Sequence, residues 1–136
     1  MPLDREELVE LAVQRYFVAV NEGDLDTVLA TFSADCCVRF ASGEFEYRGE
    51  DALNAHFREF RETFAIIDFR KFEHLVDVER QSIAVRFEVR LVDHQGSTTL
   101  MQNCNFFQVN DRGQFYDIVV YNTAPLDDGF SAGNSS

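Results

Sequence analysis

The stretch SIAVRFEVRLVDHQGSTTLMQNCNFFQV, residues 82–109, decides the fold of this 136-residue chain. In its first half Phe87, Val89 and Leu91 alternate with charged residues, and this period of two is typical of a β-strand with one dry face. Polar residues and a glycine at 94–97 then mark a turn before a second strand. The stretch therefore predicts an antiparallel hairpin.

The same period of two continues on either side of this hairpin. Further strands are expected at about 67–78 and 114–121, separated from it by short polar turns. Four consecutive strands joined by such turns predict an antiparallel meander. Two shorter strands, at about 36–40 and 45–47, precede the meander in the chain.

The amino-terminal half carries a helical period instead. Apolar residues recur at helical spacing over 4–20 and again over 25–32, and Asp24 is placed to be the N-cap of the second helix. A third helix is expected over 51–64, where the apolar residues share one face. We therefore predict an α+β fold in which three helices pack on a curved antiparallel sheet.

Composition excludes several classes of partner. The chain has 24 acidic and 12 basic residues, a formal net charge of −12, which repels nucleic acid and anionic membrane surfaces. The amino terminus lacks the apolar segment of a signal peptide and no apolar stretch approaches the length of a bilayer span, which predicts a cytoplasmic protein. Three cysteines, two of them adjacent at Cys36 and Cys37, suit a reducing compartment and have no further ligands at metal spacing. We expect neither a metal nor a cofactor.

Length and the carboxyl terminus indicate a single domain. A chain of 136 residues is long enough for one core. Residues 1–125 are expected to form this domain. Residues 126–136 are polar and rich in Gly and Ser, and are expected to form a poorly ordered tail.

The last strand is apolar on both faces. Val119 and Tyr121 are expected on one side, together with Phe115. Ile118 and Val120 are expected on the other. Helices can cover only one of these faces, so a second copy of the chain is predicted to cover the other, in a homodimer formed through the sheet.

Four short motifs occur in a fixed order along the chain: RYFVAVNEGDL at 15–25, FSAD at 32–35, YRGEDAL at 47–53 and NDRGQF at 110–115. In order and spacing they resemble the superfamily named after nuclear transport factor 2, with its SnoaL-like and ketosteroid-isomerase-like branches. The resemblance implies a cone in which the curved sheet wraps around the helices and admits a small, mostly apolar molecule.

The resemblance also implies positions for a site. The isomerase branch uses a tyrosine on the first helix, an aspartate base after the first short strand and an acid on the third long strand. Here Tyr16 matches the tyrosine, Phe40 replaces the base and Asn105 replaces the acid. The SnoaL-type cyclases place their acid/base aspartate on the final strand, where this chain has Val120. His56 aligns with a pocket-lining position of the third helix, and imidazole is suited to proton transfer near neutral pH.

We therefore expect Tyr16, His56 and Asn105 to be the catalytic residues. Asn103 and Asn105 lie two apart on one face of a strand. Burying two amides in a dry core is costly, which favours a polar pocket floor over a packing role. The side chains expected to bind a small hydrophobic ligand are Phe17, Phe40, Phe57, Phe60, Asn103, Ile118, Val120 and Asn122.

Two questions stay open in the sequence. Along 82–92 either Glu88 and Arg90 or the apolar set that includes Phe87 enters the cavity, and the apolar set better suits the helix stripes. The domain either acts on a small hydrophobic metabolite as a cofactor-free isomerase, dehydratase or cyclase through an enolate, or it is a non-catalytic binding or dimerisation module. A ring-hydroxylase small-subunit role would require a partner chain.

Overall fold

A computed structural model of the protein describes residues 2–123, so the tail predicted at 126–136 lies outside the described residues. The first helix runs without a break through α1 (Arg5–Val9), η1 (Glu10–Val18) and α2 (Ala19–Glu22). It is the first of the three predicted helices.

This helix is capped at its start and widened in its middle. The backbone N–H of Glu7 donates to the Asp4 carboxylate at 2.8 Å, and the N–H of Asp4 donates to the Glu7 carboxylate at 2.9 Å. η1 is π-helical, and a π-helix turns less per residue than an α-helix. Adjacent Tyr16 and Phe17 both face the sheet, at 5% and 0% exposure, and each contacts Phe107.

Asp24 caps the second helix, α3 (Leu25–Ala30), as predicted. The predicted extension of this helix as far as Phe32 is wrong. Phe32 instead opens strand β1 (Phe32–Phe40), because it pairs with Phe115 on the last strand. β1 is therefore longer at its start than the sequence predicts.

The third helix, α4 (Glu50–Thr63), follows the short strand β2 (Glu46–Arg48) and agrees with its predicted range. Gly49 joins the two elements at a φ of 91°, a conformation that residues with a Cβ rarely adopt. Leu53 and Phe57, from the predicted apolar face, are buried against the rest of the domain.

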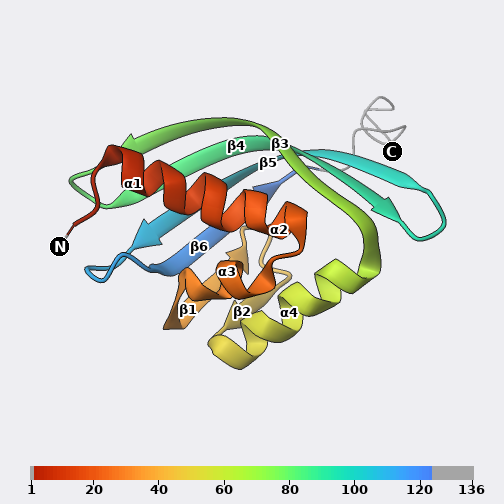
Figure 1. The fold of residues 1–136 in the computed structure, drawn as a ribbon, viewed down its shortest axis with the longest axis horizontal. Coiled ribbons are helices and arrows are strands. Elements are labelled where there is room, and N and C mark those ends of the chain that lie inside the picture. The colour runs from red at the N-terminus through yellow and green to blue at the C-terminus, as the bar shows by residue number, and fades with distance from the viewer. Residues whose placement is uncertain (1, 124–136) are drawn as a thin grey trace.

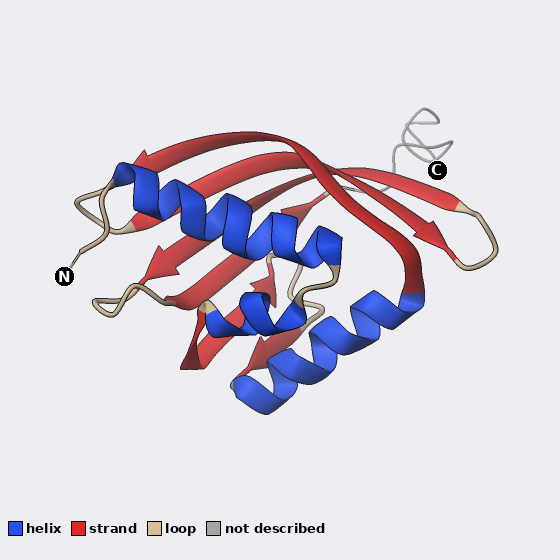
Figure 2. Cartoon of the chain, in the orientation of Figure 1, coloured by secondary structure: helices blue, strands red, loops and turns tan. Residues whose placement is uncertain are grey.

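Six strands form one sheet in the order β2-β1-β6-β5-β4-β3. The four long strands are β3 (Phe64–Asp77), β4 (Ser82–Asp93), β5 (Thr98–Val109) and β6 (Phe115–Asn122), which confirms the meander. Neighbours are antiparallel except β1 and β6, which run parallel. Figure 1 and Figure 2 show a curved sheet with the helices along its hollow side. The protein is α+β, as predicted.

Strand β4 presents its apolar set to the helices. Phe87, Val89 and Leu91 are buried, whereas Glu88 and Arg90 alternate with them and lie on the outer face of the sheet. The structure therefore selects the apolar alternative that the sequence favoured.

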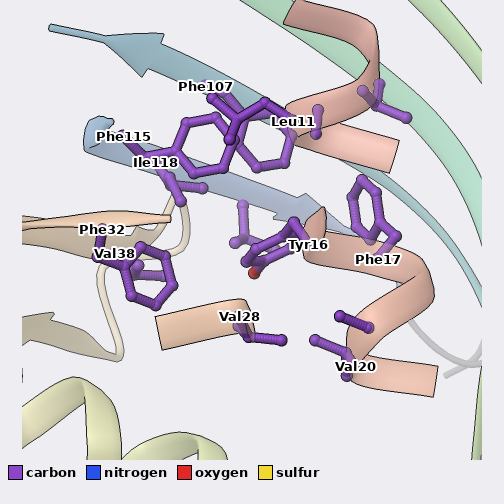
Figure 3. Packing of buried hydrophobic residues seen from close by; sticks show 14 of the residues in the cluster. Leu11, Tyr16, Phe17, Val20, Val28, Phe32, Val38, Phe107, Phe115 and Ile118 are labelled. Carbon is purple, nitrogen blue, oxygen red and sulfur yellow. The ribbon is translucent and has the colours of Figure 1, made fainter. Parts of the chain in front are cut away.

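Strand β6 departs from strict alternation. Its register with β5 shifts between Gln108 and Val109. An irregularity of this kind moves the side chains beyond it to the opposite face of the sheet. Phe115 is therefore fully buried, and Figure 3 shows it in the core beside Ile118. The prediction that Phe115 faces outward with Val119 is wrong for this reason.

Candidate functional site

A cavity of about 140 Å³ lies between the helices and the hollow side of the sheet. Its walls come from η1, α4, β1 and all four long strands. Tyr16, His56 and Asn105, the residues predicted to be catalytic, all line it. Three polar side chains from distant parts of the chain therefore border one mostly apolar space.

Most of the side chains predicted to bind a ligand line the same cavity. Ile118 differs: it is fully buried in the core, as Figure 3 shows, and is not among the residues that line the cavity. The other predicted residues in the lining are Phe17, Phe40, Phe57, Phe60, Asn103, Val120 and Asn122.

The wall also contains residues outside the predicted set. Alternation along β5 carries a signal for Met101, which lies two before Asn103. Phe69 and Met101 both pair with Val89, one from each side, and the register that brings Phe69 here is visible only in the structure. The lining residues that the sequence did not predict are Val38, Phe69 and Met101, whereas Phe87, Val89 and Leu91 belong to the apolar alternative favoured for β4.

Tyr16 is held by packed aromatic rings. Its ring makes edge contacts with Phe17, Phe57 and Phe107, at centroid distances of 4.9, 6.0 and 5.3 Å. Burial raises the pKa of its hydroxyl above the ordinary value, and nearby Cys36 raises it further. Tyr16 is therefore protonated at neutral pH and can donate a hydrogen bond.

His56 lies on α4 within a stack of rings. Its imidazole stacks on Tyr47 at a centroid distance of 4.0 Å and an interplanar angle of 22°, and it meets Phe57 edge-on at 5.1 Å. Burial lowers the pKa of His56 from 6.5 to about 4. The ring is therefore neutral at pH 7, so one of its nitrogens can accept a proton.

Asn103 and Asn105 form a polar part of the wall on β5. Asn105 is 3% exposed and pairs with Val120 on β6, while Asn103 pairs with Asn122. The side-chain oxygens of Asn103 and Asn105 are buried, and no group within residues 2–123 donates a hydrogen bond to either. Because buried amide oxygens normally have a partner, these two mark the polar end of the cavity.

Among the described residues no carboxylate lines the cavity. Phe40 and Val120, which the family resemblance aligns with the aspartates of two enzyme branches, are neighbours across β1 and β6. Glu88 lies on the outer face, where two cationic side chains contact it at 3.2 and 3.0 Å. Within the described lining, His56 is therefore the side chain best suited to accept a proton at neutral pH.

The adjacent cysteines are buried and their thiols are held protonated. Burial raises the pKa of Cys36 to about 12, with Cys37 as a smaller cause. Burial also raises the pKa of Cys37. Such thiols are poor nucleophiles because the thiolate is the reactive form.

The described part of the chain holds neither a metal site nor a membrane-spanning helix. Residues 2–123 contain no group of three or more His, Cys, Asp and Glu side chains placed to hold a metal ion. None of the helices described there has the length and apolar character needed to cross a membrane.

Comparison with known proteins agrees with this architecture. A family model described as a SnoaL-like domain matches residues 13–118. AusH from Aspergillus nidulans is 20% identical, with a TM-score of 0.77 and 99% of each chain covered. An NTF2-like protein from Burkholderia xenovorans is 20% identical, with a TM-score of 0.72, over 88% of this chain and 92% of that chain.

A third similar structure is that of SalBIII, an epoxide hydrolase/cyclase-like enzyme in pyran ring formation in the polyether salinomycin. It is 19% identical, with a TM-score of 0.74, over 88% of this chain and 93% of that chain. A search of curated proteins found no significant match. At these identities the likenesses to solved structures establish the fold.

Proposed function

Since the chain belongs to the SnoaL-like domain family, we propose that its cavity binds a small, mostly apolar carbonyl compound and isomerises, dehydrates or cyclises it through an enolate, without a cofactor. The observation that carries this proposal is the common cavity lined by Tyr16, His56 and Asn105. His56 takes the proton next to the carbonyl group. Tyr16 and Asn105 donate hydrogen bonds to the oxygen on which negative charge develops.

His56 suits the role of base because it is neutral at working pH. Its pKa of about 4 leaves the imidazole unprotonated above pH 5. A base of similar strength is sufficient in ketosteroid isomerase, where an aspartate has a pKa of about 4.6. The stack on Tyr47 at 4.0 Å also fixes the plane of the ring before a substrate arrives.

Tyr16 and Asn105 suit the role of oxyanion donors for a different reason. Both side chains are almost fully buried, at 5% and 3% exposure. A hydrogen bond to a developing negative charge is strongest where water is excluded. Neither side chain ionises at neutral pH, since burial raises the pKa of Tyr16 and an amide does not titrate.

Cyclohex-3-en-1-one is a suitable test compound. It is a single ring, and its isomerisation to the conjugated enone is followed by ultraviolet absorption. We expect the protein to accelerate this isomerisation, and His56→Gln to lower the rate about a hundredfold or more. Tyr16→Phe should lower it to a similar extent, about a hundredfold.

Asn54→Leu is the matched control for this assay. Asn54 lies on α4 with His56 but is not among the residues that line the cavity. This variant should keep the full rate. Isomerisation by His56→Gln at the rate of the unchanged protein would rule out His56 as the base.

A second candidate function is a binding module without turnover. The observation that favours it is the lack of a carboxylate in the described lining, with Phe40 and Val120 at the positions of the family's aspartates. Under this alternative the ketone binds equally to the unchanged protein and to His56→Gln, and neither protein raises the rate of isomerisation. The two candidates are therefore separated by the same assay.

We also propose that the protein is a homodimer joined through the outer face of the sheet. A row of apolar side chains crosses this face, because Leu75, Ala84, Phe106 and Val119 are paired in sequence across four strands. Leu75 is 78% exposed and Phe106 is 44% exposed. Contiguous exposed apolar side chains are typical of interfaces, and a two-fold axis would place the same row of a second copy against this one.

Sedimentation measurements test the dimer. The double variant Leu75→Glu with Phe106→Glu places charges in the proposed interface, and we expect it to be a monomer. Phe45→Ser is the control, because Phe45 is also an exposed apolar residue, at 52% exposure, but precedes β2 and lies outside the row. A monomer for the unchanged chain at every concentration would contradict the proposal.

A further inference from the structure

The two amide oxygens at the polar end of the cavity indicate what is bound there. Resting on the function proposed above, we propose that the substrate is an uncharged, single-ring ketone with a hydroxyl group on the carbon next to its carbonyl. The hydroxyl donates to the side-chain oxygen of Asn105. The ketone oxygen accepts hydrogen bonds from the Asn105 amide N–H and from the Tyr16 hydroxyl.

The ligand is expected to carry a hydrogen-bond donor because the acceptor oxygens at the polar end of the cavity are buried. The side-chain oxygens of Asn103 and Asn105 are buried without a donor from any residue in 2–123. A ligand group that packs against these acceptors must therefore bring its own donor, because an acceptor left unpaired in a buried site is costly.

The shape of the Asn105 side-chain amide determines where the ligand's hydroxyl group lies relative to the ligand's ketone group. A side-chain amide carries an acceptor oxygen and a donor nitrogen on the same carbon atom. A hydroxyl on the carbon next to a ketone presents a donor and an acceptor on neighbouring carbons, in the complementary order. Asn105 can therefore bind both groups at once. Asn103, two residues away on the same face of β5, offers a second acceptor to a more highly hydroxylated ring.

The lining also requires an uncharged molecule. None of the described residues that line the cavity is Asp, Glu, Lys or Arg, and burial keeps His56 neutral at pH 7. A buried charge without a partner is strongly unfavourable. The formal net charge of −12 further opposes anionic ligands.

The volume of the cavity matches a substrate body of one ring. The cavity measures about 140 Å³, and an apolar cavity of about 150 Å³ in another protein holds benzene. Its apolar wall includes the rings of Phe57, Phe60 and Phe87, which suit a flat or nearly flat ring.

Calorimetry with a matched set of ligands tests the inference. The set contains 2-hydroxycyclohexanone, cyclohexanone without the hydroxyl, and cyclohexanecarboxylate with a negative charge. We expect the hydroxyketone to bind about tenfold more tightly than cyclohexanone, because only it supplies a donor to the buried oxygen. The carboxylate should show no binding at pH 7, and measurable binding would overturn the requirement for an uncharged ligand.

Two variants test whether Asn105 causes the preference for the hydroxyketone over cyclohexanone. Asn105→Leu should bind the hydroxyketone and cyclohexanone with affinities within about twofold of each other, because the preference is lost with the acceptor. Asn54→Leu, outside the cavity, should retain the preference. If a variant fails to fold, the ligand affinities measured on the unchanged protein still test the inference.

The outcomes distinguish this inference from the proposed function. Equal affinity of the unchanged protein for the hydroxyketone and cyclohexanone would overturn the inference, while isomerisation of cyclohex-3-en-1-one would still support the proposed function. Retention of the preference in Asn105→Leu would also overturn it, because the donor would then be recognised elsewhere. If no ketone binds, the proposed function fails and the inference fails with it.

Discussion

The buried imidazole of His56 should make the protein less stable in acid. Burial lowers the pKa of His56 in the folded chain to about 4, whereas the exposed side chain has a pKa of 6.5. Between these two pH values the unfolded chain binds a proton that the folded chain excludes. The free energy of unfolding therefore falls as the pH is lowered through this range, and the full contribution of the neutral ring is present above pH 6.5.

The size of the effect follows from the two pKa values. A fall from 6.5 to about 4 corresponds to a loss of about 3 kcal/mol. The ring of His56 is only partly buried, and solvent screening reduces this figure to roughly 2 kcal/mol. Even the smaller value is a large fraction of the stability of a domain of this size.

Urea unfolding of the unchanged protein and of His56→Gln at pH 7 and pH 4 measures this contribution. Other groups titrate alike in both proteins, so the difference between their free energies of unfolding isolates His56. We expect the advantage of the unchanged protein over His56→Gln to shrink by roughly 2 kcal/mol from pH 7 to pH 4. An unchanged difference would refute the argument, because the ring would then lie in water.

Four further predictions concern stability and pH. Asn21→Leu should lower the free energy of unfolding by about 2 kcal/mol or more, because Asn21 exchanges two hydrogen bonds with the backbone of Phe69, at 2.9 and 2.8 Å. Asn105→Leu should not lower it, since its side-chain oxygen has no partner in the described chain, and a loss equal to that of Asn21→Leu would contradict this. Phe107→Ala, at a fully buried position, should cost about 3–5 kcal/mol in urea unfolding, and a loss under about 1 kcal/mol would count against the described core. The rate of isomerisation should be constant above pH 5 and should fall below about pH 4 as His56 gains a proton, whereas a fall near pH 6.5 would place the base in water.

Local patterns in the sequence were sufficient for much of the fold. The alternation around Phe87 predicted β4 and its buried face, because one face of that strand carries only apolar side chains. Asp24 predicted the start of α3, because a carboxylate satisfies the free N–H groups of a first turn. Both signals lie within a few residues of the structure they specify.

The errors arose where distant strands decide the conformation. Phe32 joins β1 because Phe115, far along the chain, pairs with it. The inward turn of Phe115 depends on a register shift opposite β5, and a single-residue shift reverses the side that a residue faces. Neither effect leaves a local pattern in the sequence.

For the same reason, only some residues of the candidate site could be predicted from the sequence. Tyr16 and His56 were identified through the family resemblance and line the cavity. Phe69 was not identified, because β3 contains an irregularity between Arg70 and Glu73, with Lys71 at a φ of 59°, that alternation does not reveal. The missing hydrogen-bond donors at the amide oxygens are also a property of the folded state alone.

The most direct test of the central claim, that the cavity receives a small uncharged ring, uses the methionine methyl groups. The chain contains two methionines, Met1 and Met101, and Met101 lines the cavity. In protein labelled with ¹³C at the methionine methyl groups, we expect 2-hydroxycyclohexanone to shift the Met101 resonance saturably and cyclohexanecarboxylate to leave it in place. A Met101 resonance that does not respond to any concentration of the hydroxyketone would contradict the account.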